Sequence, residues 1–176
     1  MFPHLFNSLS VVIPVLSSTF ASVGRFLKHA GNKSLGMLII DESGQAVPQS
    51  ALGAIYRTKR AVVVGDPLQV EPVVTIPKVL IDILADSTGV ANEYKVIENS
   101  AQTFADNINE FNGMIGNRQV GCPLVVHRRC IDPMFSISNL ISYDNRMFNK
   151  TNKKEEYLKP ENPFLIKKSG WINVEG

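Results

Sequence analysis

Short apolar runs alternate with amphipathic stretches along the first half of the chain. The runs are rich in Val, Ile and Leu and predict strands at 10–16, 36–41 and 60–64. The stretches have the apolar spacing of helices and lie at 20–30, 48–56 and 78–85. Because strands and helices alternate and the strands are almost continuously apolar, the pattern predicts an α/β fold with a parallel sheet buried on both faces.

The second half of the chain has a weaker pattern. Residues 100–115 predict an amphipathic helix whose apolar side includes Ile108 and Phe111. Residues 124–126 predict a short strand, and Asp132 is placed to cap a helix that ends near residue 142. The alternation of strand and helix therefore continues beyond the first half.

The end of the chain changes in composition. Residues 151–163 are charged and predict a surface segment, whereas 164–174 contain strand-like runs. A change of composition between 116 and 121 predicts two units, which we place at 1–116 and 117–176. Only about 60 residues follow this boundary, a length that is marginal for an independent core, so we expect the second unit to belong to a larger parent protein.

Composition narrows the class of protein. Hydrophobic residues make up 44% of the 176 residues and charged residues 19%, values typical of a globular protein rather than a disordered one. The formal net charge of +2 is too small to indicate nucleic-acid binding, which must be argued from particular residues. Cys122 and Cys130 form no CxxC pair, and no apolar run reaches the ~18 residues of a membrane-spanning helix. The opening segment lacks the basic start of a signal peptide, so we expect a cytoplasmic protein with no membrane contact.

The first candidate for chemistry is a pair of acids after the predicted strand at 36–41. Asp41 and Glu42 lie at the carboxyl end of that strand, where open α/β sheets bind their ligands. One carboxylate in such a place can hold a hydrated Mg²⁺ while the other orients a water molecule. An ordinary alternative is that Asp41 caps a helix and Glu42 is a solvated neighbour.

The second candidate is the turn that ends the strand at 60–64. Gly65 and Asp66 form this turn, and the side chain of Gln69, which follows them, can contact a γ-phosphate or an attacking water. An ordinary strand-to-loop turn is the alternative. We expect the tips of the two strands to converge on a common magnesium–phosphate locus, which indicates nucleotide hydrolysis.

The phosphate-binding loop that such a site requires is absent from this sequence. Its pattern, GxxxxGK[ST], holds the β- and γ-phosphates with backbone amides and a lysine. The nearest string, GNKS at 31–34, lacks the first glycine and the adjacent Gly-Lys pair, and it follows a predicted helix rather than a strand. We interpret it as a turn.

Three segments together resemble a known family. They are DESGQA at 41–46, VGDPLQVEP at 64–72 and VHRRC at 126–130. They look like motifs II, III and IV of superfamily-1 helicases, of the branch with DEAGQ and GDxxQLPP signatures, whose members unwind DNA or RNA. The resemblance extends over 12–176. It implies a partial RecA-like P-loop NTPase core that lacks the Walker A strand–loop–helix, with 1–116 in the first lobe and 117–176 opening the second.

The resemblance also implies roles for residues of the first two motifs. Asp41 would coordinate Mg²⁺, Glu42 would polarise the hydrolytic water and Gln69 would sense the γ-phosphate. Gln45, Gly65 and Asp66 are further candidates for nucleotide binding. Ser43 stands where the family commonly has alanine, which we interpret as a mild change.

Residues outside these motifs carry two more implied roles. An arginine of the third motif would reach ATP across the cleft between the two lobes. The family commonly has Gln-Tyr-Arg here, which favours Arg129. Because His127 and Arg128 replace the Gln and Tyr of that pattern, Arg128 also stays open as the residue that contacts the nucleotide. Ser18 and Thr19 resemble strand-end hydroxyls that touch the nucleic-acid backbone. Capping of the helix that follows is an equal alternative for these two residues.

Three hypotheses of function follow. The first is an internal fragment of an ATP-dependent helicase. The parent protein uses Mg²⁺ and ATP to move on DNA or RNA. The fragment itself is expected to be inactive and to bind neither Mg²⁺ nor ATP. The second is a non-catalytic interaction module from a truncated helicase. Under either hypothesis, exposed lobe surfaces and an unpaired sheet edge favour self-association of the fragment. The third is a metal-dependent phosphodiesterase built on Asp41, Glu42 and Asp66, for which the sequence offers no second metal shell.

Overall fold

The computed structural model describes residues 2–95, 97 and 99–151, and it has a mixed α/β architecture with small parallel sheets flanked by helices. It divides into two compact units, Met1–Met114 with Gln119–Cys122 and Ile115–Arg118 with Pro123–Gly176. Within the described residues no helix has the length and apolarity needed to cross a membrane. Cys122 and Cys130 are free thiols.

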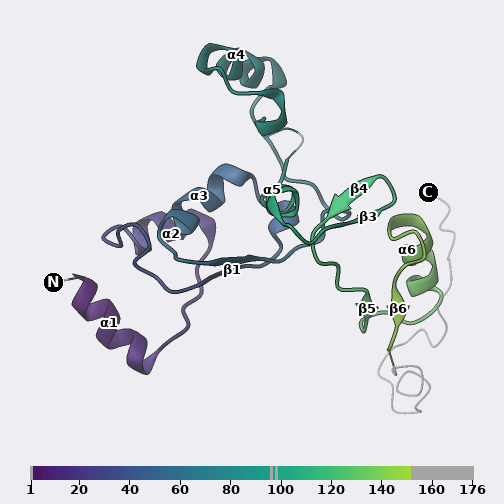
Figure 1. The fold of residues 1–176 in the computed structure, drawn as a ribbon, viewed down its shortest axis with the longest axis horizontal. Helices are drawn as coiled ribbons and strands as arrows, with labels where there is room; N and C mark the ends of the chain where they lie inside the picture. Colours follow the sequence, from purple (N-terminus) through teal and green to yellow (C-terminus); the bar gives the residue numbers. More distant parts are fainter. Residues whose placement is uncertain (1, 96, 98, 152–176) are drawn as a thin grey trace, which may run out of the picture. The chain divides into compact units, whose positions relative to one another are not determined.

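Figure 1 shows the order of the elements. Those before residue 110 are α1 (Phe2–Val12), α2 (Phe20–Phe26), β1 (Leu38–Ile40), the 3₁₀ helix η1 (Ser43–Gln45), α3 (Pro48–Tyr56), β2 (Ala61–Val63), α4 (Lys78–Thr88), the 3₁₀ helix η2 (Asn92–Tyr94) and α5 (Ala101–Ile108). Those after it are β3 (Gly113–Ile115), β4 (Arg118–Val120), β5 (Val126–His127), α6 (Met134–Ser142) and β6 (Phe148–Asn149).

The core of the first unit lies on one face of a parallel strand pair. β1 and β2 pair in parallel with Ile39 opposite Val62, and the chain passes from one to the other through η1 and α3. Helices α2, α3 and α5 supply the side chains that cover this face. The cluster consists of Ile40, Ala46, Ala51 and Ala101, with Phe20, Leu38 and Val63 packed against it.

The opposite face of the strand pair is open, which corrects the prediction of a sheet buried on both faces. Ile39 is 67% exposed and Val62 45% exposed. Successive side chains of a strand point to opposite faces, so the helices that cover Ile40 cannot also cover Ile39. No element of the described chain covers the second face, although its residues are as apolar as those of the first.

Several predicted helices of the first unit have the expected positions. The prediction of a helix at 48–56 is confirmed by α3, and the helix predicted from residue 78 is α4, which runs on to Thr88. Gly89 ends α4 in the left-handed conformation (φ 69°) that commonly terminates helices. The helix predicted at 20–30 ends at Phe26.

The strand predicted at 10–16 is wrong. Residues up to Val12 belong to α1, and residues 13–19 have no regular structure. Within the described chain no strand pairs with this segment, and an apolar run without a partner strand has nothing to hold it extended. The helix stops just before Pro14 because the residue that precedes a proline is disfavoured in the helical conformation.

The helix predicted at 100–115 starts at the expected place and ends early. Ser100 accepts a hydrogen bond from the backbone N–H of Thr103 (3.1 Å), and the Thr103 hydroxyl accepts one from the N–H of Ser100 (2.8 Å), which forms a capping box. Asn109 ends the helix because its side chain accepts the N–H of Phe111 (3.1 Å), a local bond that competes with the helical ladder. Ile115 therefore lies in β3.

The second unit packs α6 beside the parallel pair β5–β6. Asn139 of α6 donates to the carbonyl of Met147 (3.1 Å) and accepts its N–H (3.0 Å), which ties the helix to the segment that leads into β6. Asp132 does not cap α6 as predicted: Pro133 occupies the cap position, and the Asp132 carboxylate instead accepts the hydroxyl of Ser136. The predictions for 151–163 and 164–174 lie, apart from Thr151, outside the described residues.

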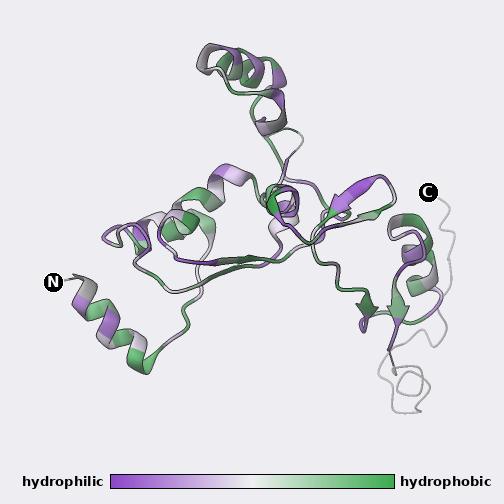
Figure 2. Cartoon of the chain, viewed as in Figure 1, coloured by the Kyte–Doolittle hydropathy of each residue, from purple (hydrophilic) through white to green (hydrophobic). Residues whose placement is uncertain are grey.

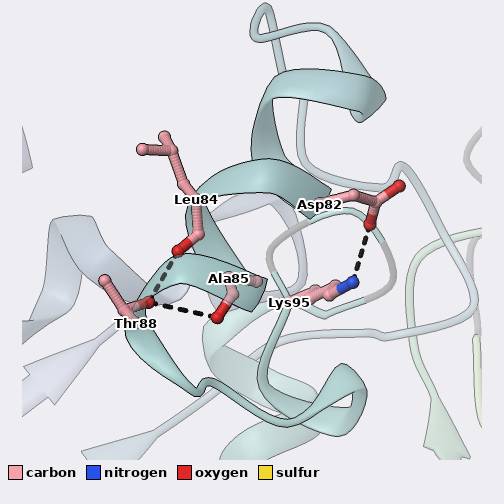
Figure 3. Close-up of polar contacts among 5 residues, drawn as sticks. All are labelled: Asp82, Leu84, Ala85, Thr88 and Lys95. Atoms are coloured by element: carbon pink, nitrogen blue, oxygen red, sulfur yellow. Dashed lines mark hydrogen bonds and ion pairs between the residues drawn. The ribbon is translucent and has the colours of Figure 1, made fainter.

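Helix α4 carries polar and apolar residues around its circumference (Figure 2) and ends in local hydrogen bonds. The Thr88 hydroxyl donates to the carbonyl of Leu84 (2.7 Å), and Lys95 donates to the carboxylate of Asp82 (2.7 Å) (Figure 3). The hydrogen bond from Lys95 lowers the pKa of Asp82, with a further contribution from the charges of Lys95 and Lys78.

Replacing Lys95 with methionine is expected to raise the pKa of Asp82 towards its ordinary value. In the native chain the pair stabilises the fold at neutral pH, and this contribution is lost as the pH falls through the lowered pKa of Asp82. Carbon-13 NMR titration of the Asp82 carboxyl in both chains measures the difference. An identical titration in the two chains would contradict the role of Lys95.

Candidate functional site

The acidic residues after β1 lie in a tight, exposed turn. The backbone N–H of Glu42 donates to the carboxylate of Asp41 (3.0 Å), and both side chains are exposed. Glu42 adopts the left-handed conformation (φ 53°, ψ 37°), which costs a non-glycine residue of the order of 1 kcal/mol. Such a conformation persists only where surrounding contacts impose it, and residues that carry it often belong to functional sites.

Helix η1 holds the Glu42 side chain in place. Gln45 donates its side-chain amide to the Glu42 carboxylate (3.3 Å) and its backbone N–H to the Glu42 carbonyl (3.0 Å). Glu42, rather than Asp41, occupies the cap position of η1, and its side chain makes no capping bond. Gln45 therefore belongs to the same small cluster as the two acids.

The turn after β2 is organised by Asp66. Its carboxylate accepts the backbone N–H of Leu68 (2.9 Å) and the side-chain amide of Gln69 (2.7 Å). Asp66 is partly buried, and Gln69 is exposed. The first bond is an Asx turn, so part of the role of Asp66 is local structure, while the second fixes the direction of the Gln69 amide.

The two turns touch through their backbones. The N–H of Ser43 donates to the carbonyl of Val64 (3.0 Å). A Cβ added at Gly44 would lie 2.5 Å from the carbonyl oxygen of Asp66, and one added at Gly65 would lie 2.6 Å from the nitrogen of Gly44. Only glycine at both positions allows this approach. The structure therefore brings the segments 41–46 and 65–69 together at the carboxyl ends of two neighbouring parallel strands.

Sequence reasoning missed a buried polar chain beneath the acidic turn. The Ser43 hydroxyl is fully buried and donates to the side-chain carbonyl of Gln102 in α5 (2.6 Å). Gln102 in turn donates to the carboxylate of Asp106 (2.7 Å). The signal that could have pointed to it is the serine at a position where alanine is common, because a buried hydroxyl requires a partner.

The predicted arginines lie in the second unit, at the carboxyl end of β5. Arg128 and Arg129 are both exposed. His127 shapes the turn that carries them: its Nε2 accepts the backbone N–H of Cys130 (2.7 Å), and its ring contacts that of Phe135 at a tilt of 43°, with the centroids 5.3 Å apart. The contacts of the second unit do not favour one arginine over the other.

Ser18 and Thr19 lie in the exposed segment before α2. Thr19 occupies the cap position of that helix, and its carbonyl accepts the N–H groups of Ser22 (3.0 Å) and Val23 (2.9 Å). Its hydroxyl makes no capping bond. The following residue, Phe20, packs against the cluster around Ile40, so the segment that carries the two hydroxyls leads directly into the core.

Residues 5–76 match the family model of an AAA domain, a domain found in superfamily-1 helicases. The match includes both turns of the site, from Asp41 to Gln69, and covers less than half of the chain. This part of the chain is therefore similar to a domain of helicase-like ATPases. The comparisons with curated proteins and with solved structures found no match.

The donor set of the acidic turn suits a hard cation. Neither Asp41 nor Glu42 forms an ion pair with another described residue. Nor do three or more His, Cys, Asp or Glu side chains of the described chain gather as a complete metal site. Mg²⁺ is usually held by one or two carboxylates together with water and substrate phosphates, and an exposed carboxylate beside a second one fits that requirement.

Proposed function

We propose that this chain is part of the ATP-hydrolysing core of a superfamily-1 helicase, of the branch with DEAGQ and GDxxQLPP signatures. In this proposal residues 1–116 belong to the first RecA-like lobe and 117–176 to the second. The observation that carries the proposal is the backbone contact between the turns at 41–46 and 65–69, at the ends of two neighbouring parallel strands. Nucleotide-binding sheets present their ligand residues at this position.

Each residue of the site has a chemical task in this proposal. Asp41 holds Mg²⁺, which when bound neutralises charge on the β- and γ-phosphates. Glu42 orients the attacking water and accepts its proton, and Gln45 keeps the Glu42 carboxylate in position. Gln69 exchanges its bond with Asp66 for a contact with the γ-phosphate, so that the turn at 65–69 responds to the state of the nucleotide.

The remaining functions depend on a phosphate-binding loop that this sequence lacks, on the arginines of the second unit and on the segment before α2. GxxxxGK[ST] does not occur in the 176 residues, so the chain by itself lacks the backbone amides and the lysine that hold the phosphates. We therefore propose that the chain alone is inactive and that the parent supplies this loop. Arg128 or Arg129 stabilises charge on the transferred phosphate, and Ser18 and Thr19 contact the backbone of DNA or RNA.

ATP hydrolysis by the parent protein, with and without single-stranded nucleic acid, tests the proposal. We expect an in-frame GxxxxGK[ST] ahead of residue 1 in the gene, and hydrolysis that single-stranded DNA or RNA accelerates. A gene without such a loop would instead support a non-catalytic interaction module. Metal-dependent cleavage of the nucleic acid without ATP would support a phosphodiesterase.

A further inference from the structure

A chain of buried side chains connects the acidic turn to Gly121. The Ser43 hydroxyl donates to Gln102 (2.6 Å), Gln102 donates to Oδ1 of Asp106 (2.7 Å), and that same oxygen accepts the backbone N–H of Gly121 (3.0 Å). All three side chains are at least nine-tenths buried. These hydrogen bonds thus connect Ser43, the residue after Glu42, to Gly121 at the end of the first unit. The main segment of the second unit begins two residues later, at Pro123.

The fit around Gly121 is close. A Cβ at this position would lie 2.9 Å from Oδ1 of Asp106 and 3.0 Å from Nδ2 of Asn109. Both atoms are ends of side chains, so a larger residue at this position would have to push them away from the backbone N–H. The position of Gly121 therefore depends on Asp106, and the position of Asp106 depends on Gln102.

Stability alone is a poor explanation for this arrangement. The second oxygen of Asp106, Oδ2, is buried and has no hydrogen-bond partner in the described part of the chain. A buried carboxylate with an unsatisfied oxygen is usually less stabilising than an apolar side chain of similar size. Well-attested uses of such buried polar groups are to fix register and to specify one arrangement over another.

We propose that Ser43, Gln102 and Asp106 are positioning residues that hold the acidic turn and Gly121 in a fixed mutual arrangement. When the acidic turn moves, Ser43 moves with it, and the hydrogen bonds through Gln102 and Asp106 displace Gly121 in the segment that leads to the second unit. The use of this connection to report the state of a bound nucleotide rests on the proposed function. The connection itself depends only on bonds within the first unit.

Amide hydrogen exchange at Gly121, measured by NMR on the full chain without nucleotide, tests the proposal. Ser43→Ala is expected to speed exchange at Gly121 by about tenfold, because it frees Gln102 and loosens Asp106. Thr58→Val is the control: Thr58 is buried in the same unit, and among the described residues its hydroxyl bonds only the carbonyl of Ile55 (3.0 Å), outside the polar chain. Equal acceleration in the two variants would overturn the proposal, since it would show general destabilisation.

A double-mutant cycle distinguishes coupling between Ser43 and Asp106 from two independent effects on exchange at Gly121. In an Asp106→Leu background, Ser43→Ala is expected to raise the exchange rate at Gly121 by less than about twofold, because the hydrogen bonds that connect the two residues are already broken. Additive effects would overturn the proposal. If Asp106→Leu does not fold, Gln102→Met takes the place of that variant in the cycle, because it removes the middle side chain of the three.

Asp106→Asn provides the conservative rescue. Its carbonyl oxygen can accept both bonds that Oδ1 accepts, so we expect Gly121 to stay as protected as in the native chain. Loss of protection as large as in Asp106→Leu would overturn the positioning role of Oδ1. Because no nucleotide is present, these results neither require nor decide the proposed ATPase function.

Discussion

Replacing Gly44 with alanine is expected to lower the free energy of unfolding of the first unit by about 3 kcal/mol. The added Cβ would lie 2.5 Å from the carbonyl oxygen of Asp66 and 3.1 Å from its carbonyl carbon. Both are backbone atoms, which cannot rotate out of the way as a side chain can. The turns at 41–46 and 65–69 would have to separate, and the bond from Ser43 to Val64 would lengthen.

Gly24→Ala is the matched control for this prediction. Gly24 lies within α2, and a Cβ added there would meet no atom within 4 Å. Alanine in a helix interior is favoured over glycine by about 0.5–1 kcal/mol, so this variant should be slightly more stable than the native chain. Urea unfolding followed by circular dichroism measures both variants. A loss of stability in Gly44→Ala no larger than the change in Gly24→Ala would refute the close contact of the two turns.

Replacing Glu42 with glutamine in the ATP-hydrolysing parent is expected to reduce turnover by about 10²–10⁴-fold, the usual contribution of a general base. Glutamine has nearly the same shape, and its carbonyl oxygen can still accept the amide of Gln45. The left-handed turn should therefore be retained, while the group that takes the proton from water is lost. Steady-state hydrolysis, together with the affinity for a non-hydrolysable ATP analogue, separates a loss of chemistry from a loss of binding.

Asp86→Asn controls for the removal of a negative charge. Asp86 lies on α4, is exposed and belongs to neither turn, so its replacement should leave turnover within about twofold of native, as is usual for a surface change far from the site. If Glu42→Gln also retained native turnover, another group would have to accept the proton from the water. Weakened binding of the analogue with unchanged turnover at saturation would assign Glu42 to the nucleotide rather than to the water.

Local sequence patterns were sufficient for features that depend on neighbouring residues. The helix at 48–56 follows from a proline near its first turn and from apolar spacing that one helix face can bury. The positions of the two turns follow from short apolar runs, each ended by polar or small residues. The same local reasoning failed at 10–16, where the pattern is apolar but a strand needs a partner that the described chain does not supply.

The sequence by itself determined which residues follow the strands, and hence which carboxylates and amides the turns carry. Only the tertiary structure decided what these turns contact. Ser43 and Gln102 are 59 positions apart, and nothing near either residue encodes their bond. Likewise, the approach of Gly44 to Asp66 and the exposure of Ile39 depend on where helices pack against the strands. Periodicity shows that a residue is apolar or can turn the chain, whereas packing between distant segments determines what the residue meets.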